Sequence, residues 1–403
     1  MSRVLWGFIG MYAYSNKYGV VDLKTSPSAY GEIMTVGITP VIQVDFIYGV
    51  NGEIFSTSSV SATIGTNNSN LEISCSGSSG SYAQIQTKNY MRYRPGQGNG
   101  LRFTAIFTTG SEGTKQLYGV GDDNDGYFIG MSGSNFGILR RSFGVEYWTL
   151  QEDFNVDRLD GSTGTTFAYD PTKGNVFDMQ YQWLGYGAIT FNIEDPETGL
   201  FIPFHKIKYS NTSTVPTTQY ASNPITIRVE TNQDTAVPPT LKGASMMAYL
   251  EGERVYTGPV FAQSATVSSF SATTNTNIIT IKNNTTFKGI ENKIPAKTKV
   301  LTFSCEGNKP LVVSLHKNAT LAGSPSYTNV GSDSTMSYTK ASAGVSGGSL
   351  IGSFTLSKSG NLFITEKDFE QFINPGDTLT FAASTVSGGN GDVVYTINWV
   401  EDH

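Results

Sequence analysis

The best candidate for a metal site in this sequence is GVGDDNDGYFIG, residues 119–130. Asp122, Asp123 and Asp125 lie between two predicted strands, and oxygen-rich loops of this kind can hold calcium. Their spacing does not follow the EF-hand pattern, and no glutamate follows at the distance that this pattern requires. Aspartate and asparagine also shape tight hairpin turns. An Asp- and Asn-rich turn is therefore the favoured interpretation, and a calcium loop is the alternative.

Three further side chains are candidates for contact with a ligand or a neighbouring subunit. Arg92 and Arg94 stand beside a Pro-Gly turn in RYRPGQG, where guanidinium groups can meet an acidic or sulfated glycan or remain solvated. Tyr186 lies in the turn of an aromatic hairpin, and if the protein forms a fibre its Tyr- and Asn-rich loops are the candidates to face a receptor.

Histidines and serines do not form a recognisable catalytic set. The sequence has three histidines, His205, His316 and His403, and none lies in an HExxH or CxxC context, which argues against zinc. A serine hydrolase places its nucleophile between a strand and a helix. The one G-x-S-x-G match, residues 344–348, lies in a predicted loop with no helix after it.

Carboxylates also lack the pattern of a glycoside hydrolase, which needs two of them across a cleft. A sandwich glucanase typically carries E-x-D-x-(x)-E along one strand, and no predicted strand of this sequence carries it. The one match, residues 366–370, lies in a segment predicted below as a helix. Glu194, Asp195 and Glu197 cluster in the turn EDPETG and are interpreted as solvated turn residues. The sequence therefore predicts no catalytic residues, no enzymatic activity and no required cofactor.

The composition favours sheets. Charged residues make up 15% of the 403 residues, and aromatic residues 12%, together with 44 glycines. Few charges with many aromatic, hydroxyl and glycine residues suit strands and turns. The net charge of −6 offers no basic field for nucleic acid. No apolar stretch approaches the roughly 20 residues of a membrane helix, so no membrane span is expected.

The alternation of FDMQYQWLGYGAITFNIEDPETG, residues 177–199, predicts a β-hairpin. Its expected inward side chains are Phe177, Met179, Tyr181, Trp183, Ile189, Phe191 and Ile193. Two glycines in the turn supply the positive φ that a tight reversal needs. Pro203, in the next strand, predicts an edge or a bulge because proline lacks a ladder donor.

The predicted fold class is all-β, with two tandem antiparallel β-sandwich (jelly-roll-like) domains and an N-terminal arm. We assign the arm to residues 1–39, the first sandwich to 40–258, a linker to 259–276 and the second sandwich to 277–403. The linker lacks charge and any strong apolar period. One helix is predicted in TEKDFEQFINPG, residues 365–376.

Both cysteines stand in phase with the apolar face of a predicted strand. Cys75 ends LEISC and Cys305 ends LTFSC, and the two are expected in different domains. Inward thiols of this kind behave as small hydrophobic residues, not as a disulfide. The prediction is folding in a reducing compartment, the host cytoplasm in the interpretation below.

Long segments of the chain resemble a family of virion structural proteins of large DNA viruses and tailed phages. The resemblance rests on residues 92–110, 119–130 and 171–201, and on NPGDTLTFAAST and YTINW near the C-terminus. The first domain also resembles concanavalin/laminin-G sandwiches, which often bind glycans, sometimes with calcium. The family implies particle assembly or surface display, and it offers no catalytic residues to carry over.

The leading prediction is therefore a non-enzymatic component of the virion, in the capsid shell, at a vertex, or in a surface fibre or spike. Its implied partners are other virion proteins, further copies of itself in a symmetric oligomer such as a trimer, and a host-surface glycan. The alternative is a secreted carbohydrate-binding or carbohydrate-cleaving β-sandwich protein. A cellular adhesion module would need an anchor signal that the sequence does not show.

Overall fold

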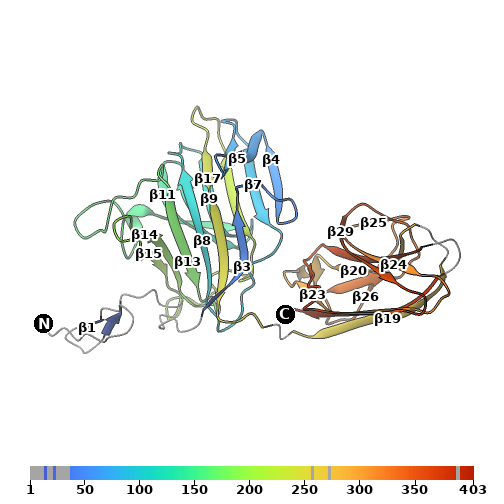
Figure 1. Ribbon diagram of the computed structural model, residues 1–403. Coiled ribbons are helices and arrows are strands. Elements are labelled where there is room, and N and C mark those ends of the chain that lie inside the picture. Colours follow the sequence, from blue (N-terminus) through green and yellow to red (C-terminus); the bar gives the residue numbers. More distant parts are fainter. Residues whose placement is uncertain (1–12, 16–20, 24–36, 256–257, 271–273, 387–390) are drawn as a thin grey trace. The chain divides into compact units, whose positions relative to one another are not determined.

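The computed structural model describes residues 13–15, 21–23, 37–255, 258–270, 274–386 and 391–403 (Figure 1). The chain forms two compact units, Met1–Arg254 and Val255–His403. Within the described residues the one helical element is a 3-10 turn, η1 (Gln151–Asp153), and all other regular elements are strands. The predicted all-β class is confirmed. No helix of the described residues is long and apolar enough to cross a membrane.

The first unit is a sandwich of a seven-stranded and a nine-stranded sheet. The seven-stranded sheet contains, in spatial order, β12 (Val145–Leu150), β11 (Asn135–Ser142), β10 (Gly126–Ser132), β9 (Thr114–Gly121), β16 (Ile225–Thr231), β7 (Ser81–Thr87) and β4 (Phe55–Val60). Every neighbouring pair in it is antiparallel.

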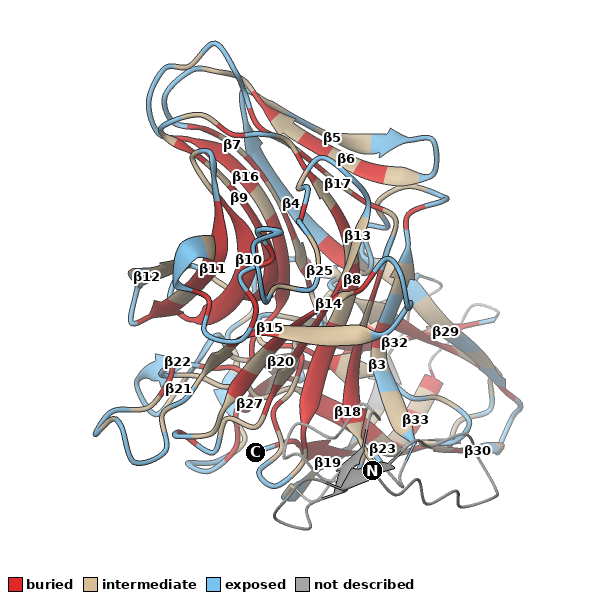
Figure 2. Ribbon diagram, turned by 90° about the vertical axis from the view of Figure 1, so that its left-hand side faces the viewer, coloured by how far each residue is buried: buried red, intermediate tan, exposed pale blue. Residues whose placement is uncertain are grey.

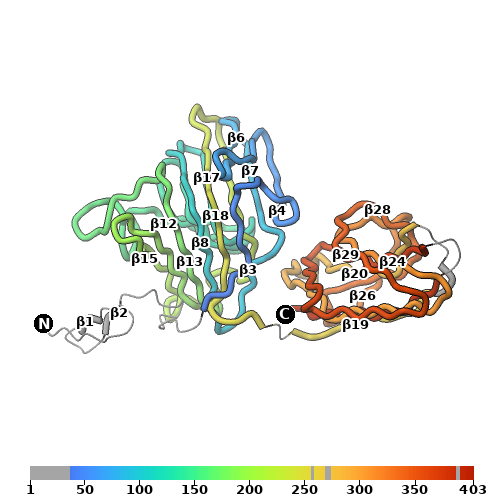
Figure 3. Tube along the Cα trace, in the orientation of Figure 1, coloured from blue at the N-terminus to red at the C-terminus, as the bar shows by residue number. Residues whose placement is uncertain are grey.

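The nine-stranded sheet branches at β8 (Asn99–Phe107). On one side of β8 lie β13 (Asn175–Tyr181), β14 (Ile189–Glu194) and β15 (Phe201–Ile207). On the other side lie β17 (Thr240–Gly243), β6 (Asn70–Cys75) and β5 (Ala62–Asn67) along one branch, and β18 (Ser245–Glu251) and β3 (Ile38–Asp45) along the second. Figure 3 traces the path of the chain through these strands.

Aromatic side chains fill the space between the two sheets. The rings of Phe103, from the nine-stranded sheet, and Tyr118, from the seven-stranded sheet, stack with their centroids 4.0 Å apart, and Phe177 lies 5.4 Å from Phe103. Buried and less buried residues alternate along β7 and β8, as Figure 2 shows by colour. Because successive side chains of a strand point to opposite faces, each core strand also presents a second row of side chains outward.

The predicted hairpin is formed by β13 and β14. Phe177, Met179 and Tyr181 pair with Ile193, Phe191 and Ile189, and all six side chains are buried. Trp183 differs from the prediction, because β13 ends at Tyr181 and Trp183 lies in the turn with a φ of 42°. The bulge expected at Pro203 is confirmed by a register shift between β14 and β15 at Phe191 and Asn192.

Replacing Trp183 by alanine should lower the free energy of unfolding of the first unit by about 1–3 kcal/mol, less than for a fully buried tryptophan. Its ring packs on Tyr93 with centroids 5.5 Å apart, and its Nε1–H donates to Thr218 Oγ1 (3.1 Å). Urea unfolding of Trp183→Ala and Trp183→Phe separates the ring packing from the hydrogen bond, since phenylalanine keeps the packing and lacks the donor. Unchanged stability of the alanine variant would contradict the packing role.

The second unit is also a two-sheet sandwich, with its own core. One sheet contains β19 (Val260–Phe270), β33 (Gly391–Glu401), β23 (Ala296–Cys305) and β30 (Asn361–Thr365), with β31 (Phe372–Ile373) beside β23. The other contains β26 (Thr328–Asn329), β27 (Met336–Thr339), β20 (Thr276–Asn283), β32 (Thr378–Thr385), β24 (Leu311–Lys317) and β29 (Ser349–Leu356). Two small hairpins are β21 (Thr286–Phe287) with β22 (Ile290–Glu291), and β25 (Thr320–Leu321) with β28 (Val345–Ser346).

The predicted linker, 259–276, is wrong in most of its length. It contains β19, which pairs with β33 from Val260 opposite Val400 onward. Phe261, Ala265 and Val267 pack against the second core, and the Phe261 ring lies 6.3 Å from that of Trp399. Small alanine, serine and threonine side chains made the alternation too weak to recognise from the sequence.

The predicted helix at 365–376 is also wrong. The Asp368 carboxylate accepts hydrogen bonds from the amide and hydroxyl of Thr365 (3.0 and 2.7 Å), which closes a turn. The chain then forms β31, which pairs with β23. Strand pairing therefore overrides the local helical pattern.

Most of the predicted arm, 1–39, lies outside the described residues. Within it, β1 (Ala13–Ser15) and β2 (Val21–Leu23) pair as a two-stranded sheet, and β3 begins at Ile38.

Candidate functional site

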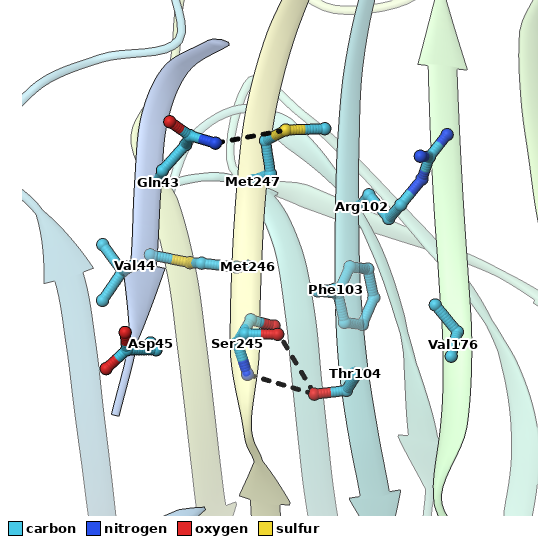
Figure 4. A pocket seen from close by; sticks show the side chains of 10 residues that line it. All are labelled: Gln43, Val44, Asp45, Arg102, Phe103, Thr104, Val176, Ser245, Met246 and Met247. Carbon is cyan, nitrogen blue, oxygen red and sulfur yellow. Dashed lines mark hydrogen bonds between the residues drawn. The ribbon is translucent and has the colours of Figure 1, made fainter. Parts of the chain in front are cut away.

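A pocket of about 360 Å³ lies on the outer face of the nine-stranded sheet, across β3, β18, β8 and β13 (Figure 4). Its walls are Gln43, Asp45, Arg102, Thr104, Val176, Ser245 and Met247. Val44, Phe103 and Met246 alternate with these residues, pack toward the core and form the floor. We call this site the sheet pocket.

The buried carboxylate of Asp178 lies beside the sheet pocket and fixes the position of Arg102, which lines the pocket. Asp178 on β13 is 1% exposed and accepts hydrogen bonds from Arg102 Nε (3.2 Å), Tyr249 Oη (3.0 Å) and Asn192 Nδ2 (3.4 Å). Burial raises the pKa of Asp178, and the Arg102 charge opposes that shift. Because Asp178 is covered, it orients Arg102 and does not itself face a ligand.

Tyr249 reaches Asp178 only because residue 100 is glycine. A Cβ atom at Gly100 would lie 2.1 Å from Tyr249 Cζ, so any other residue would displace the ring. Gln180 Nε2 also donates to Tyr249 Oη (3.4 Å). The Tyr249 ring thus lies across β8, and its hydroxyl donates to the Asp178 carboxylate, which also binds Arg102.

The outer face of the seven-stranded sheet carries a different arrangement. Six side chains of alternating charge form a closed ring of ion pairs, in the order Lys115, Glu146, Arg141, Asp123, Arg228 and Glu230. The shortest contacts are Arg228–Glu230 (2.6 Å), Lys115–Glu146 (2.7 Å) and Arg141–Glu146 (2.7 Å). On the same face, Leu117, Phe128 and Leu139 form a separate buried apolar cluster with Trp148 packed against it.

The charged ring places two carboxylates close together. Lys115 Nζ contacts Glu146 Oε2 (2.7 Å) and Glu230 Oε1 (3.2 Å). Burial acts to raise the pKa of Glu146, but the hydrogen bonds from Lys115 and Arg141 outweigh it and leave the pKa lowered. The pKa of Glu230 is lowered in the same way, with Arg228 and Lys115 outweighing burial. Both groups are therefore held ionised.

The structure supports the turn interpretation of the Asp-rich loop. Asp122 Oδ1 accepts from the amides of Asn124 (2.8 Å) and Asp125 (2.9 Å), and Asp125 Oδ1 accepts from the amide of Gln219 (2.8 Å). Asp123 instead belongs to the charged ring. The three carboxylates do not converge, and no cluster of three metal-ligating residues occurs among the described residues.

The three predicted contact residues lie away from the sheet pocket. Arg92 and Arg94 are half-buried. Tyr93, between them, accepts a hydrogen bond from the amide of Leu184 in the hairpin turn (3.2 Å). Tyr186, in the same turn, is 43% exposed. The structure thus brings the arginine segment and the hairpin turn together, and neither lines the sheet pocket.

The remaining candidates have structural roles. His205 is buried and accepts a hydrogen bond at Nδ1, and His316 Nε2 lies 3.1 Å from Ser314 Oγ. Cys75 and Cys305 are buried free thiols, as predicted.

Two predictions concerned loops, residues 194–197 and residues 344–348. Asp195 accepts hydrogen bonds from the Glu197 amide (3.0 Å) and the Thr198 hydroxyl (2.6 Å), as a turn residue does, but it is buried and not solvated as predicted. Residues 344–348 include the short strand β28, and another strand, β29, follows them. They form no strand-to-helix elbow.

Sequence reasoning missed Arg102, Asp178 and Tyr249. The sequence places Asp178 at an outward position between two buried hairpin residues. An aspartate at such a position is usually solvated, so this position was the one signal for the site and did not by itself indicate a buried carboxylate. Their meeting depends on the registers of β8 with β13 and with β18, which no local pattern encodes.

No family model matches the sequence, and no curated protein matches it. Solved structures similar to the chain include a glycosyl hydrolase family 16 protein from Mycobacterium smegmatis (13% identity, 52% of this chain and 100% of that one, TM-score 0.35). A Bacillus licheniformis β-glucanase shares 9% identity over 55% of this chain and 100% of its own (TM-score 0.35). A β-1,3-glucanase from Mycobacterium marinum shares 13% over 52% and 98% (TM-score 0.34). At this level of identity the likeness concerns the fold.

These comparisons contradict two predictions made from the sequence, that the chain is a virion component and that it has no enzymatic activity. The structures named above are glycosyl hydrolases and glucanases, and none of them is a virion protein.

Proposed function

We propose that the first unit binds a carbohydrate in the sheet pocket. The observation that carries the proposal is the pocket itself, whose walls mix hydrogen-bonding and apolar side chains. Its volume lies within the roughly 300–1,000 Å³ of small-ligand sites. A sugar presents hydroxyl groups around its ring edge and C–H groups on its faces, so it needs walls of both kinds.

The walls offer complementary chemistry along the pocket. Arg102 supplies donors only, Asp45 supplies acceptors, and the Gln43 amide supplies both. Met247 and Val176 provide apolar surface for C–H groups. Hydroxyl groups both donate and accept, so a carbohydrate can satisfy this set without carrying a charge of its own.

Filling the sheet pocket should abolish binding. We expect Ser245→Trp, which places an indole in the pocket from an exposed strand position, to weaken oligosaccharide binding by about tenfold or more. The matched control is Ser58→Trp, an exposed serine on β4 of the other sheet. Calorimetric titration with neutral and acidic oligosaccharides, including β-1,3 and mixed-linkage glucans, measures the effect. Equal affinities of the two variants, or no binding by the unchanged protein, would refute the proposal.

A second candidate function, glycoside cleavage, rests on the charged ring. Glu146 Oε2 and Glu230 Oε1 both contact Lys115 Nζ, at 2.7 Å and 3.2 Å, so they lie less than about 6 Å apart. This limit is compatible with the roughly 5–5.5 Å between the two carboxyl groups of retaining glycosidases. The cations around Glu146 and Glu230 hold both carboxylates ionised, so either can act as the nucleophile. The other would have to be protonated when substrate binds, because retaining hydrolysis also needs an acid to protonate the leaving oxygen. Reducing-end release from glucans by the unchanged protein, Glu146→Gln and Glu230→Gln tests this. Activity retained by both variants would exclude the pair.

A further inference from the structure

We infer that the sheet pocket selects an acidic carbohydrate and that Arg102 binds its carboxylate. This inference rests on the proposed function and adds the class of ligand. Uronic-acid chains carry one carboxylate per acidic ring, and a single fixed guanidinium is the group that recognises such a charge with direction.

Arg102 is held rigidly before any ligand arrives. Its Nε donates to buried Asp178 (3.2 Å), and its guanidinium carbon lies 4.7 Å from the centroid of the Phe201 ring and 5.7 Å from that of Tyr249. Two aromatic rings and one carboxylate thus fix the plane and the rotation of the group. A fixed guanidinium loses less conformational entropy when it binds than a free one does.

The terminal nitrogens of Arg102 remain available. The hydrogen bond and ion pair that the structure gives this side chain both use Nε, and neither terminal nitrogen has a partner among the described residues. The side chain is 38% exposed and forms one wall of the sheet pocket. Two terminal N–H groups in one plane match the two oxygens of a carboxylate.

The opposite end of the pocket gives the ligand a direction. Asp45 pairs with Ser245 on β18, while Arg102 pairs with Met247 on the same strand. Asp45 is therefore two strands from Arg102, roughly 10 Å away at the usual strand spacing. A carboxylate is attracted at the Arg102 end and repelled at the Asp45 end, where hydroxyl groups fit instead.

The test compares polygalacturonate oligosaccharides with their methyl esters, which keep the sugar and remove the charge. We expect the unchanged protein to bind the acid about tenfold or more tightly than the ester, and Arg102→Gln to remove that preference. Arg102→Lys should recover only part of it, because an ammonium group cannot bind in the bidentate manner. Lys242→Gln, which removes a positive charge from β17 of the same sheet, is the control and should keep the full preference.

The outcomes separate the two proposals. Equal binding of acid and ester by the unchanged protein overturns the preference for acidic ligands, while the carbohydrate proposal stands if Ser245→Trp blocks both. Binding of neither refutes both proposals, provided that other oligosaccharides also fail to bind. Arg102→Gln leaves Asp178 without its cation, so circular dichroism must show each variant folded. The acid–ester comparison on the unchanged protein does not depend on any variant.

Discussion

Replacing Glu401 by alanine is expected to lower the free energy of unfolding of the second unit by about 3–5 kcal/mol. Glu401, near the end of β33, is 0% exposed. Its carboxylate accepts hydrogen bonds from the Ser334 hydroxyl (2.5 Å), the Thr335 amide (2.6 Å) and Trp399 Nε1 (3.0 Å). Alanine leaves these buried donors without an acceptor, and such groups cost more than the hydrogen bonds contribute.

Two variants separate this role from a general effect of losing a glutamate. Glu401→Gln keeps the size of the side chain but turns one acceptor oxygen into a donor, so an intermediate loss is expected. Glu306→Ala removes an exposed carboxylate that accepts from the Ser304 hydroxyl (2.5 Å), and its effect should stay within about 0.5 kcal/mol. Hydrogen exchange in urea, read on peptides of the second unit, measures the loss. Equal effects of Glu401→Ala and Glu306→Ala would contradict the argument.

Strong alternation of apolar and polar residues made most of the strands predictable from the sequence. Phe177, Met179 and Tyr181 occupy the inner face of β13 because large apolar residues at every second position can be buried only on one face. The same rule failed for β19, whose inward Ala265 contributes little apolar surface. It also failed beyond Tyr181, where Trp183 continues the spacing after the strand has ended.

The candidate site was not predictable for a different reason. Arg102, Asp178 and Tyr249 come from three strands that are far apart in sequence, and they meet through two registers. A sequence shows which face each residue occupies, but it does not show which residue lies opposite. Gly100 illustrates this limit. Residue 100 must be glycine because the Tyr249 ring lies where a Cβ atom would stand, and the sequence does not show that Tyr249 lies there.

Acidification should destabilise the first unit through His205, by about 3 kcal/mol near pH 4. The imidazole is 6% exposed, its centroid lies 5.6 Å from that of Phe154, and Nδ1 accepts from the amide of Asn155 (3.3 Å). Burial lowers its pKa from 6.5 to about 4. The unfolded chain therefore binds a proton more readily than the folded one. The contribution is complete above pH 6.5 and is lost as the pH falls toward 4.

A His205→Asn variant isolates this contribution from the titration of the carboxylates. Its Oδ1 can take the place of Nδ1 as acceptor for the Asn155 amide, and the side chain does not titrate. Urea unfolding of both proteins at pH 7, 5.5 and 4.5 gives two curves of stability against pH. The unchanged protein should be the more stable at pH 7 and lose stability more steeply on acidification, because only its folded state excludes a proton that the unfolded state takes up. Parallel curves would show that His205 can be protonated without unfolding, so the imidazole would have to reach solvent in the folded state.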